Sequence, residues 1–105
     1  MQENLIVFVT VDNQESAQKI ASNLVEERLA ACVNIVSNVE SVYRWEGKLC
    51  QDKELLLIIK TSKSHYEKLE ARILNLHSYT TPEIIALPIV KGSTAYLAWL
   101  NSSLE

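Results

Sequence analysis

A histidine, a tyrosine and a glutamate stand close together in the C-terminal half of the chain. His77, Tyr79 and Glu83 belong to a polar stretch that leads directly into an apolar segment, residues 84–90. Side chains of these types can bind a metal ion or move a proton. Their spacing therefore raises the hypothesis of a binding or acid–base site at the mouth of a strand.

Two prolines, Pro82 and Pro88, limit how this segment can pair. Proline has no backbone N–H to donate, so a strand that holds Pro88 is most easily an edge strand or lies beside a bulge. A hydrophobic edge has to be covered, often by another chain. Residues 82–90 are therefore predicted to form an edge strand that a second molecule covers.

The composition is that of an ordinary globular domain. The 105 residues are 48% hydrophobic and 22% charged, and the net charge of −3 arises from interspersed acids and bases. This balance predicts no nucleic-acid partner, and no basic amphipathic stretch suggests a membrane partner. Residues 5–9 are too short for a signal segment or a membrane span, and two cysteines are too few for a disulfide framework. We expect a single domain over residues 1–105, located in the cytoplasm.

Hydrophobic spacing predicts how the fold begins. Residues 5–11 form a continuous apolar run, which is typical of a strand covered on both faces. A capping box made by Asp12 and Glu15 then opens a helix. Its apolar residues recur at helical spacing as far as Leu29, so one side of this helix is expected to face the core.

A long hairpin is predicted next. Residues 31–45 form its outgoing strand, Gly47 marks the turn, and residues 54–61 form the return strand. A second helix follows a capping box of Ser64 and Glu67. After the strand at residues 82–90, a short final helix is expected over residues 94–101.

The order of these elements predicts an α+β, ferredoxin-like βαββαβ fold with an extended hairpin and a C-terminal helix. Two helices would cover one face of a four-stranded antiparallel sheet. The other face would lie bare, yet residues 55–59 are apolar on both sides of their strand. We therefore expect self-association to bury the second face and the hairpin tip.

Several segments resemble the CutA divalent-cation tolerance protein family. They occur in order, at the family's spacing, and cover nearly the whole chain: RLAACVNI (28–35), VYRWEGK (42–48), IKT (59–61), TPEIIALPI (81–89) and YLAWL (96–100). The resemblance implies one CutA-like domain that forms a homotrimer, similar in architecture to the PII signalling proteins. It also implies a link to the tolerance of copper and other divalent ions.

Metal binding at His77 is the first function that the resemblance raises. Copper-binding bacterial members carry a cysteine and two histidines at the positions of Val9, Leu76 and His77, so one of the three ligands is kept here. Selective transition-metal binding needs several ligands in a defined geometry. Copper or another divalent cation would thus need further ligands from Glu83 or a second subunit, and no cofactor is required. The alternative is a histidine that stabilises its loop.

Cys32 is the second candidate, because it matches a cysteine common in the family and a soft thiolate would suit Cu(I). The alternative is a small buried residue at a strand start, since free cysteine is among the most buried residue types. No base or cation adjoins it to activate the thiol. Cys50, beside the hairpin turn, is expected to be exposed rather than functional.

The third hypothesis is a small-molecule cleft between subunits. An aromatic wall with a few polar groups is the usual composition of such a site, and the chain offers Tyr43, Trp45, Lys60, Tyr79 and Glu83. Aromatic side chains on a hairpin are also typical of interfaces. Lys60 and Glu83 are equally consistent with an ion pair across adjacent strands.

An enzyme is not expected. The loop at residues 11–14 has no glycine or arginine to hold a phosphate, and no nucleophile–base pair is recognisable near either histidine. We predict a trimeric CutA-type protein that is implicated in divalent metal (copper) tolerance or response. It would bind a metal ion or small ligand at the clefts between its subunits. The alternative is a structural or signalling trimer, PII-like, that acts through a protein partner and has no metal site.

Overall fold

The computed structural model describes residues 3–105. The elements of this range are β1 (Asn4–Val11), α1 (Gln14–Glu26), β2 (Cys32–Trp45), β3 (Lys48–Ser62), η1 (Lys63–His65), α2 (Tyr66–Leu76), β4 (Ile84–Pro88) and α3 (Thr94–Ser102). None of the helices in this range is long and apolar enough to cross a membrane.

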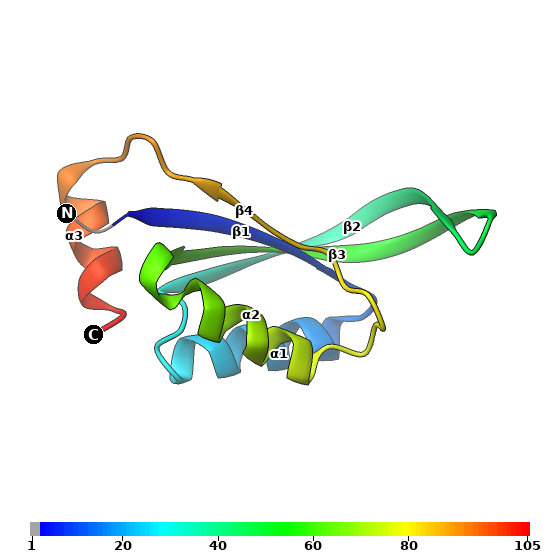
Figure 1. Cartoon of the computed structure of the whole chain (residues 1–105), viewed down its shortest axis with the longest axis horizontal. Coiled ribbons are helices and arrows are strands. Elements are labelled where there is room, and N and C mark those ends of the chain that lie inside the picture. The colour runs from blue at the N-terminus through cyan, green and yellow to red at the C-terminus, as the bar shows by residue number, and fades with distance from the viewer. Residues whose placement is uncertain (1–2) are drawn as a thin grey trace.

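The strands form an antiparallel sheet in the order β2-β3-β1-β4. Helices α1 and α2 lie on one face of the sheet, and α3 lies at the end of the molecule away from the hairpin tip (Figure 1). The predicted α+β, ferredoxin-like arrangement is thus confirmed. Within the described range β4 pairs only with β1, so it is an edge strand. It is shorter than predicted, because Pro82 lies outside it and Pro88 is its last residue.

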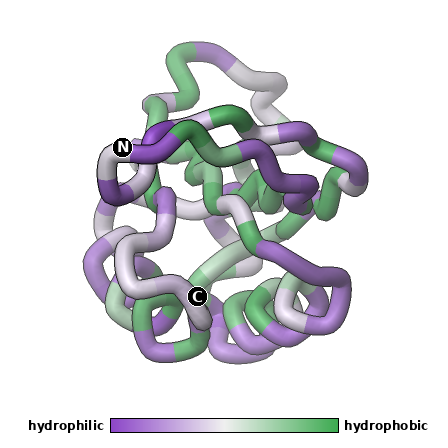
Figure 2. The backbone as a smooth tube through the Cα atoms, turned by 90° about the vertical axis from the view of Figure 1, so that its right-hand side faces the viewer, coloured by the Kyte–Doolittle hydropathy of each residue, from purple (hydrophilic) through white to green (hydrophobic). Residues whose placement is uncertain are grey.

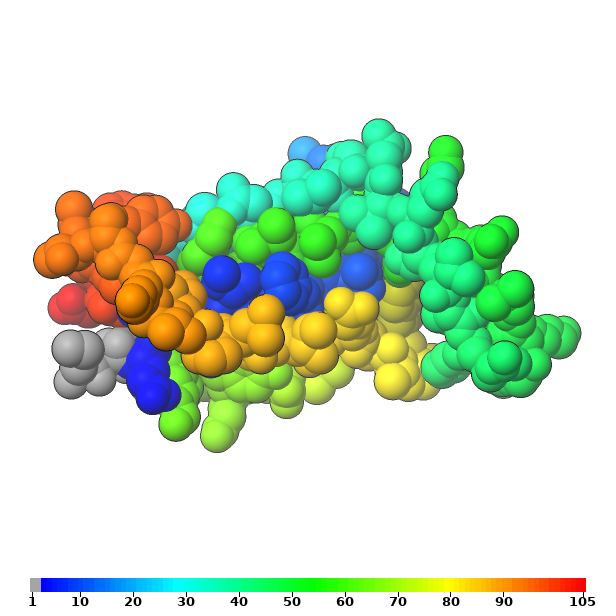
Figure 3. Space-filling view, turned by 90° about the horizontal axis from the view of Figure 1, so that it is seen from above, coloured from blue at the N-terminus to red at the C-terminus, as the bar shows by residue number. Residues whose placement is uncertain are grey.

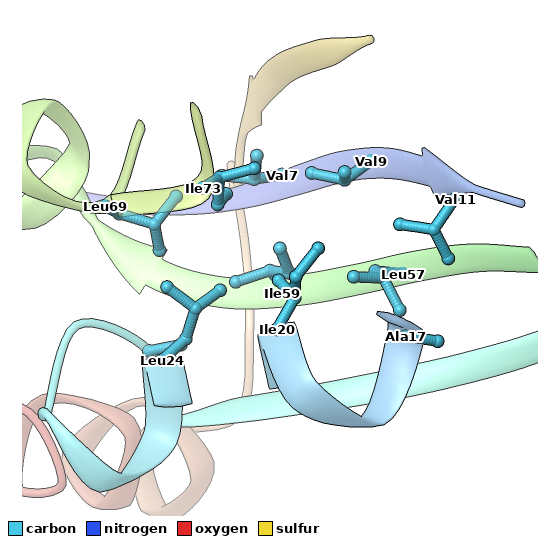
Figure 4. Packing of buried hydrophobic residues seen from close by; sticks show 11 residues of the cluster. Val7, Val9, Val11, Ala17, Ile20, Leu24, Leu57, Ile59, Leu69 and Ile73 are labelled. Atoms are coloured by element: carbon cyan, nitrogen blue, oxygen red, sulfur yellow. The ribbon is translucent and has the colours of Figure 1, made fainter. Parts of the chain in front are cut away.

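The core lies between the sheet and the helices that cover it. Alternate residues of β1 and β3 point to this side, because successive side chains of a strand face opposite ways. They interleave with residues of α1 and α2 (Figure 4). The strand and helix residues of this core are at most 1% exposed: Val7, Val9, Val11, Leu57, Ile59, Ile20, Leu24, Leu69 and Ile73. Figure 2 shows hydrophobic and hydrophilic residues interspersed along the helices at the bottom of the view, as expected for amphipathic helices.

The opposite face of the sheet carries no helix. Figure 3 looks down on it, with β2, β3, β1 and β4 side by side. The strand register places a second apolar set there, at the positions between the core residues: Ile6, Phe8, Val36, Leu56, Ile58, Ile85 and Leu87. We call this set the open face. Its outer members are strongly exposed, with Ile85 at 54% and Leu87 at 53%.

The hairpin of β2 and β3 extends well beyond the helices, and it helps to give the molecule dimensions of 44 × 25 × 22 Å (Figure 1). The register shifts between Val36 and Val39, where Asn38 has a left-handed φ of 61°. A bulge of this kind bends the strand that contains it. The turn at the tip uses Glu46 and Gly47, both with positive φ, as two-residue hairpin turns require. Gly47 is therefore the turn residue, as predicted.

Helix α3 closes the other end of the sheet. Its first turn is capped by Ser93, whose side chain accepts a hydrogen bond from the Tyr96 N–H at 3.2 Å. A small second core attaches the helix to the start of β2, and its buried residues are Ala31, Leu100 and Leu104. The predicted final helix is thus confirmed.

The two predicted capping boxes are wrong. Asn13 rather than Asp12 caps α1, and its side chain accepts the Ser16 N–H at 2.8 Å. Ser64 lies inside η1, and α2 begins after it at Tyr66. All these residues can cap a helix, so the direction in which the backbone leaves the preceding strand decides which one does.

Candidate functional site

A pocket of about 650 Å³ lies where the hairpin faces the loop between α2 and β4. Figure 3 shows the hairpin (teal) and this loop (yellow) approaching each other at one end of the open face. The lining includes three aromatic residues, two acids and several hydroxyl groups: Tyr43, Trp45, Tyr79, Glu54, Glu83, Thr10, Ser41 and Thr81. This volume and mixture are typical of small-molecule sites.

Glu54 is the buried acid of the pocket. It is only 7% exposed, and it lies on the open-face side of β3. The Tyr79 hydroxyl donates a hydrogen bond to Glu54 Oε2 at 2.7 Å. Burial, followed by this hydrogen bond, raises the pKa of the Tyr79 phenol above its ordinary value. Tyr79 therefore remains a neutral donor at physiological pH and holds the carboxylate at the pocket wall.

Tyr43 makes a similar contact on the hairpin. Its hydroxyl donates to the Asp52 carboxylate on the opposing strand, and this hydrogen bond is the main cause that raises the pKa of Tyr43 to about 12. Tyr43 and Trp45 lie on the same side of β2 and are 41% and 47% exposed. Both tyrosine hydroxyls of the pocket thus donate to carboxylates, while the rings remain available to a ligand.

His77 lies behind the pocket wall. The Tyr79 N–H donates to His77 Nδ1 at 3.1 Å, so Nδ1 is unprotonated and Nε2 donates to the Thr10 carbonyl oxygen at 2.7 Å. The rings of His77 and Tyr79 are also 4.6 Å apart. Because both ring nitrogens are engaged, His77 holds the loop against β1 and presents no free lone pair to a metal in this arrangement.

Potential metal ligands are dispersed over the described part of the chain. No group of three or more histidine, cysteine, aspartate or glutamate side chains gathers within residues 3–105. Glu83, the expected partner of His77, lines the pocket, whereas His77 does not. A metal bound at His77 would have to displace the Tyr79 hydrogen bond and recruit ligands from elsewhere.

Lys60 lies outside the pocket to which the sequence analysis assigned it. It pairs with Ile6 and Cys32, roughly 20 Å along β3 from Glu54. Its ammonium group donates to Asn34 Oδ1, and the ion pairs of the described residues do not include the predicted alternative with Glu83. The other four predicted cleft residues, Tyr43, Trp45, Tyr79 and Glu83, do come together.

Both cysteines are free and partly exposed. Cys32 Sγ lies 4.0 Å from Asn34 Oδ1. The expectation of a buried thiol at Cys32 is thus wrong for the single chain, because the strand start faces the uncovered side of the sheet.

A serine–histidine contact at the start of α2 was not foreseen. Ser62 Oγ lies 2.6 Å from His65 Nδ1, a distance that would suit a nucleophile and its base. Ser62 is 0% exposed, so no substrate reaches its hydroxyl. The contact therefore belongs to the turn that leads into α2.

The sequence analysis also missed the two acids that fix the tyrosines, Glu54 and Asp52. A signal was present for Glu54. Glu54, Leu56 and Ile58 are alternate residues of one strand and therefore lie on the same face of the sheet. That face is the one expected to be buried by self-association, so a buried acid was predictable there.

The chain matches one protein family along almost its whole length. The family model described as CutA1 divalent ion tolerance protein matches residues 5–103. This chain belongs to the CutA1 family. The resemblance noted in its sequence segments is confirmed, and the family is named for a tolerance trait rather than for a reaction.

Individual relatives agree with this assignment. The divalent-cation tolerance protein CutA of Thermus thermophilus is 52% identical over 98 residues, which are 93% of this chain and 95% of that protein. The chloroplastic protein CutA of Arabidopsis thaliana is 53% identical over 100 residues, which are 95% of this chain and 55% of that protein. The solved structure of a periplasmic divalent cation tolerance protein CutA from Archaeoglobus fulgidus has a TM-score of 0.94 and 36% identity, over 97% of this chain and 99% of that one.

Proposed function

We propose that this CutA1 protein is a homotrimeric binding protein whose intersubunit clefts take up a small ligand or a divalent metal ion. The observation that carries the proposal is the pocket beside the hairpin, where a buried carboxylate and three aromatic rings converge. Several of its residues lie on the open-face side of the sheet. A second chain that covers this face would therefore complete the wall of the pocket.

The open face supports an assembly of identical chains. Its apolar residues continue to the edge of β4, and the hairpin extends this side of the sheet with Tyr43 at 41% and Trp45 at 47% exposure. Contiguous exposed apolar surface marks interaction sites, and an uncovered edge strand invites pairing. A threefold arrangement with PII-like architecture is what the family resemblance implies.

Light scattering at micromolar concentration tests the assembly, with an expected mass of three 11.9 kDa chains. A stable monomer would overturn the proposal. Trp45→Ala is expected to weaken the trimer if the hairpin anchors it. A Trp45→Ala variant that stays trimeric at high dilution but loses a ligand would instead assign Trp45 to the cleft.

A thermal-shift screen of metal ions and metabolites tests the cleft, since any ligand that binds the native state raises its stability by mass action. Copper or another divalent cation is the candidate favoured by the family's link to divalent-ion tolerance. Calorimetric titration of Cu(II) into the wild type and into His77→Ala examines the metal directly. An unchanged affinity in the variant removes His77 as a ligand.

The alternative function is a structural or signalling trimer that acts through a protein partner without a ligand. A stable trimer that no compound of the screen stabilises would favour it. In both cases we propose a binding or regulatory role rather than an enzymatic one. We propose the cytoplasm as the compartment, because two free cysteines suit a reducing environment.

A further inference from the structure

The charged side chains that line the pocket have one sign. Glu54 and Glu83 line it, and Asp52 and Asp12 lie near enough to raise the pKa of its tyrosines. Among the described residues that line it, none is a lysine or an arginine. Lys48, which is paired with Trp45 at the hairpin tip, lies outside the lining. An anionic ligand would thus meet carboxylates with no compensating charge from this chain, and like charges repel each other.

The aromatic rings of the pocket also favour a positively charged ligand. The hydroxyls of Tyr43 and Tyr79 donate to carboxylates, which leaves these rings and the indole of Trp45 to form the apolar wall. The face of a tryptophan or tyrosine ring attracts a cation through the ring quadrupole, and the attraction grows when the cation is removed from water.

Glu54 has a particular need for a positive partner. It is 7% exposed, and the Tyr79 hydroxyl at Oε2 is the one hydrogen bond of its side chain in the described structure. The ion pairs within residues 3–105 are Lys63–Glu3 and Arg72–Glu27, so Glu54 forms no ion pair with a basic side chain of this range. A buried carboxylate gains stability when a cation comes to lie beside it.

We infer that the pocket selects an organic cation, with an alkylammonium group placed between Glu54, Glu83 and the rings of Tyr43, Trp45 and Tyr79. The inference rests on the ligand cleft proposed above and adds the chemical class of its ligand. An organic cation fits better than a bare metal ion, because the aromatic wall supplies no donor atoms for metal coordination. The same wall suits alkyl groups around a charged nitrogen.

Three probes of matched shape test the charge of the ligand. Choline carries a positive head, 3,3-dimethylbutan-1-ol has the same branched head without charge, and 3,3-dimethylbutanoate is an anion. Each is titrated calorimetrically into the wild-type protein, with EDTA present to remove metal ions. We expect choline to bind, the neutral alcohol to bind about tenfold more weakly, and the anion to give no measurable heat.

Matched variants locate the binding site. Glu54→Gln and Glu83→Gln are each expected to weaken choline binding about tenfold and to leave binding of the neutral alcohol unchanged. Glu83 is exposed, so its variant keeps the test intact if Glu54→Gln does not fold. Glu40→Gln is the control, because Glu40 lies on the hairpin next to Ser41 but outside the pocket lining.

The outcomes separate this inference from the cleft itself. Equal affinity for choline and the neutral alcohol, or tighter binding of the anion, overturns the charge assignment and leaves a ligand cleft in place. Equal choline affinity in the wild type and all three variants also overturns it, since the cation then binds elsewhere. If no probe binds, the inference fails, and only a thermal-shift screen without any stabilising compound removes the cleft as well.

Discussion

The two faces of one sheet differ sharply in what covers them. On β3, Leu57 is 0% exposed beneath α1 and α2, whereas its neighbours Leu56 and Ile58 face the uncovered side. On β4, Leu87 is 53% exposed although its hydrophobicity equals that of Leu57. The strands themselves are therefore alike on both faces. The chain supplies helices for one face only, so packing within a single chain does not account for the apolar character of the other face.

Leu57→Ala is expected to give the largest effect on folding. It removes a fully buried side chain from the helix-covered face and should lower the free energy of unfolding by about 2–5 kcal/mol. Urea denaturation followed by circular dichroism measures the loss. Leu74→Ala is the control, because Leu74 is 50% exposed on α2. Equal losses in the two variants would contradict the assignment of the core to this face.

Leu87→Lys tests the open face. If that face is the subunit interface, an ammonium group there would be buried without a partner, and the trimer should dissociate while the far-UV circular dichroism of the subunit stays unchanged. Light scattering reports the change in mass. Leu74→Lys introduces the same charge at a similarly exposed position on the helix side and should remain trimeric. A Leu87→Lys trimer would show that contacts elsewhere hold the subunits together.

Tyr79→Phe is expected to have a smaller effect, located where the open face meets the pocket. The change leaves the buried carboxylate of Glu54 without its donor and should cost about 1–3 kcal/mol in the free energy of unfolding. Tyr66→Phe is the comparison, because Tyr66 donates to a half-buried acid, Glu70, at 2.9 Å. A larger loss from Tyr66→Phe would mean that Glu54 does not depend on Tyr79.

The smallest effect concerns alkaline pH. The pKa values of Tyr43 and Tyr66 rise from 10.0 to about 12, so the folded state favours the neutral phenols. Their contribution to stability is complete below about pH 10 and is lost as the pH rises through about 12. Phenolate absorbance in the near ultraviolet should therefore appear at a higher pH than it does for free tyrosine. The Tyr43→Phe variant should lose the part of this absorbance that Tyr43 contributes. Titration at the ordinary pKa would contradict the hydrogen bond to Asp52.

Most of the fold could be predicted because the apolar residues have clear periods. Residues 5–11 read as a covered strand and became β1, and the helical spacing of Leu69 and Ile73 marked the buried side of α2. Gly47 identified the hairpin turn because a positive φ suits glycine. The helix starts were predicted wrongly, because Asp12 and Asn13 are equally able to cap α1 and only the path of the backbone selects Asn13.

The candidate site was predicted only in part, because its residues lie far apart in the sequence and meet through long-range contacts. Tyr43, Trp45, Tyr79 and Glu83 were grouped by residue type, and the bent hairpin and the loop after α2 do bring them together. Lys60 was grouped with them although the rise of an extended strand carries it far from Glu54. The engagement of His77 with Thr10 depends on how the loop returns to β1, a long-range contact that no local pattern encodes.

The bulge at Asn38 has a consequence for how this protein can diversify. Beyond it β2 and β3 are joined by backbone pairing, and no residue between Ser41 and Gln51 belongs to either hydrophobic core of the described chain. Backbone pairing accepts a wide range of side chains. Randomising this stretch, with Trp45 and the turn residues Glu46 and Gly47 kept, should therefore yield libraries in which most members keep the subunit fold while their ligand preferences differ.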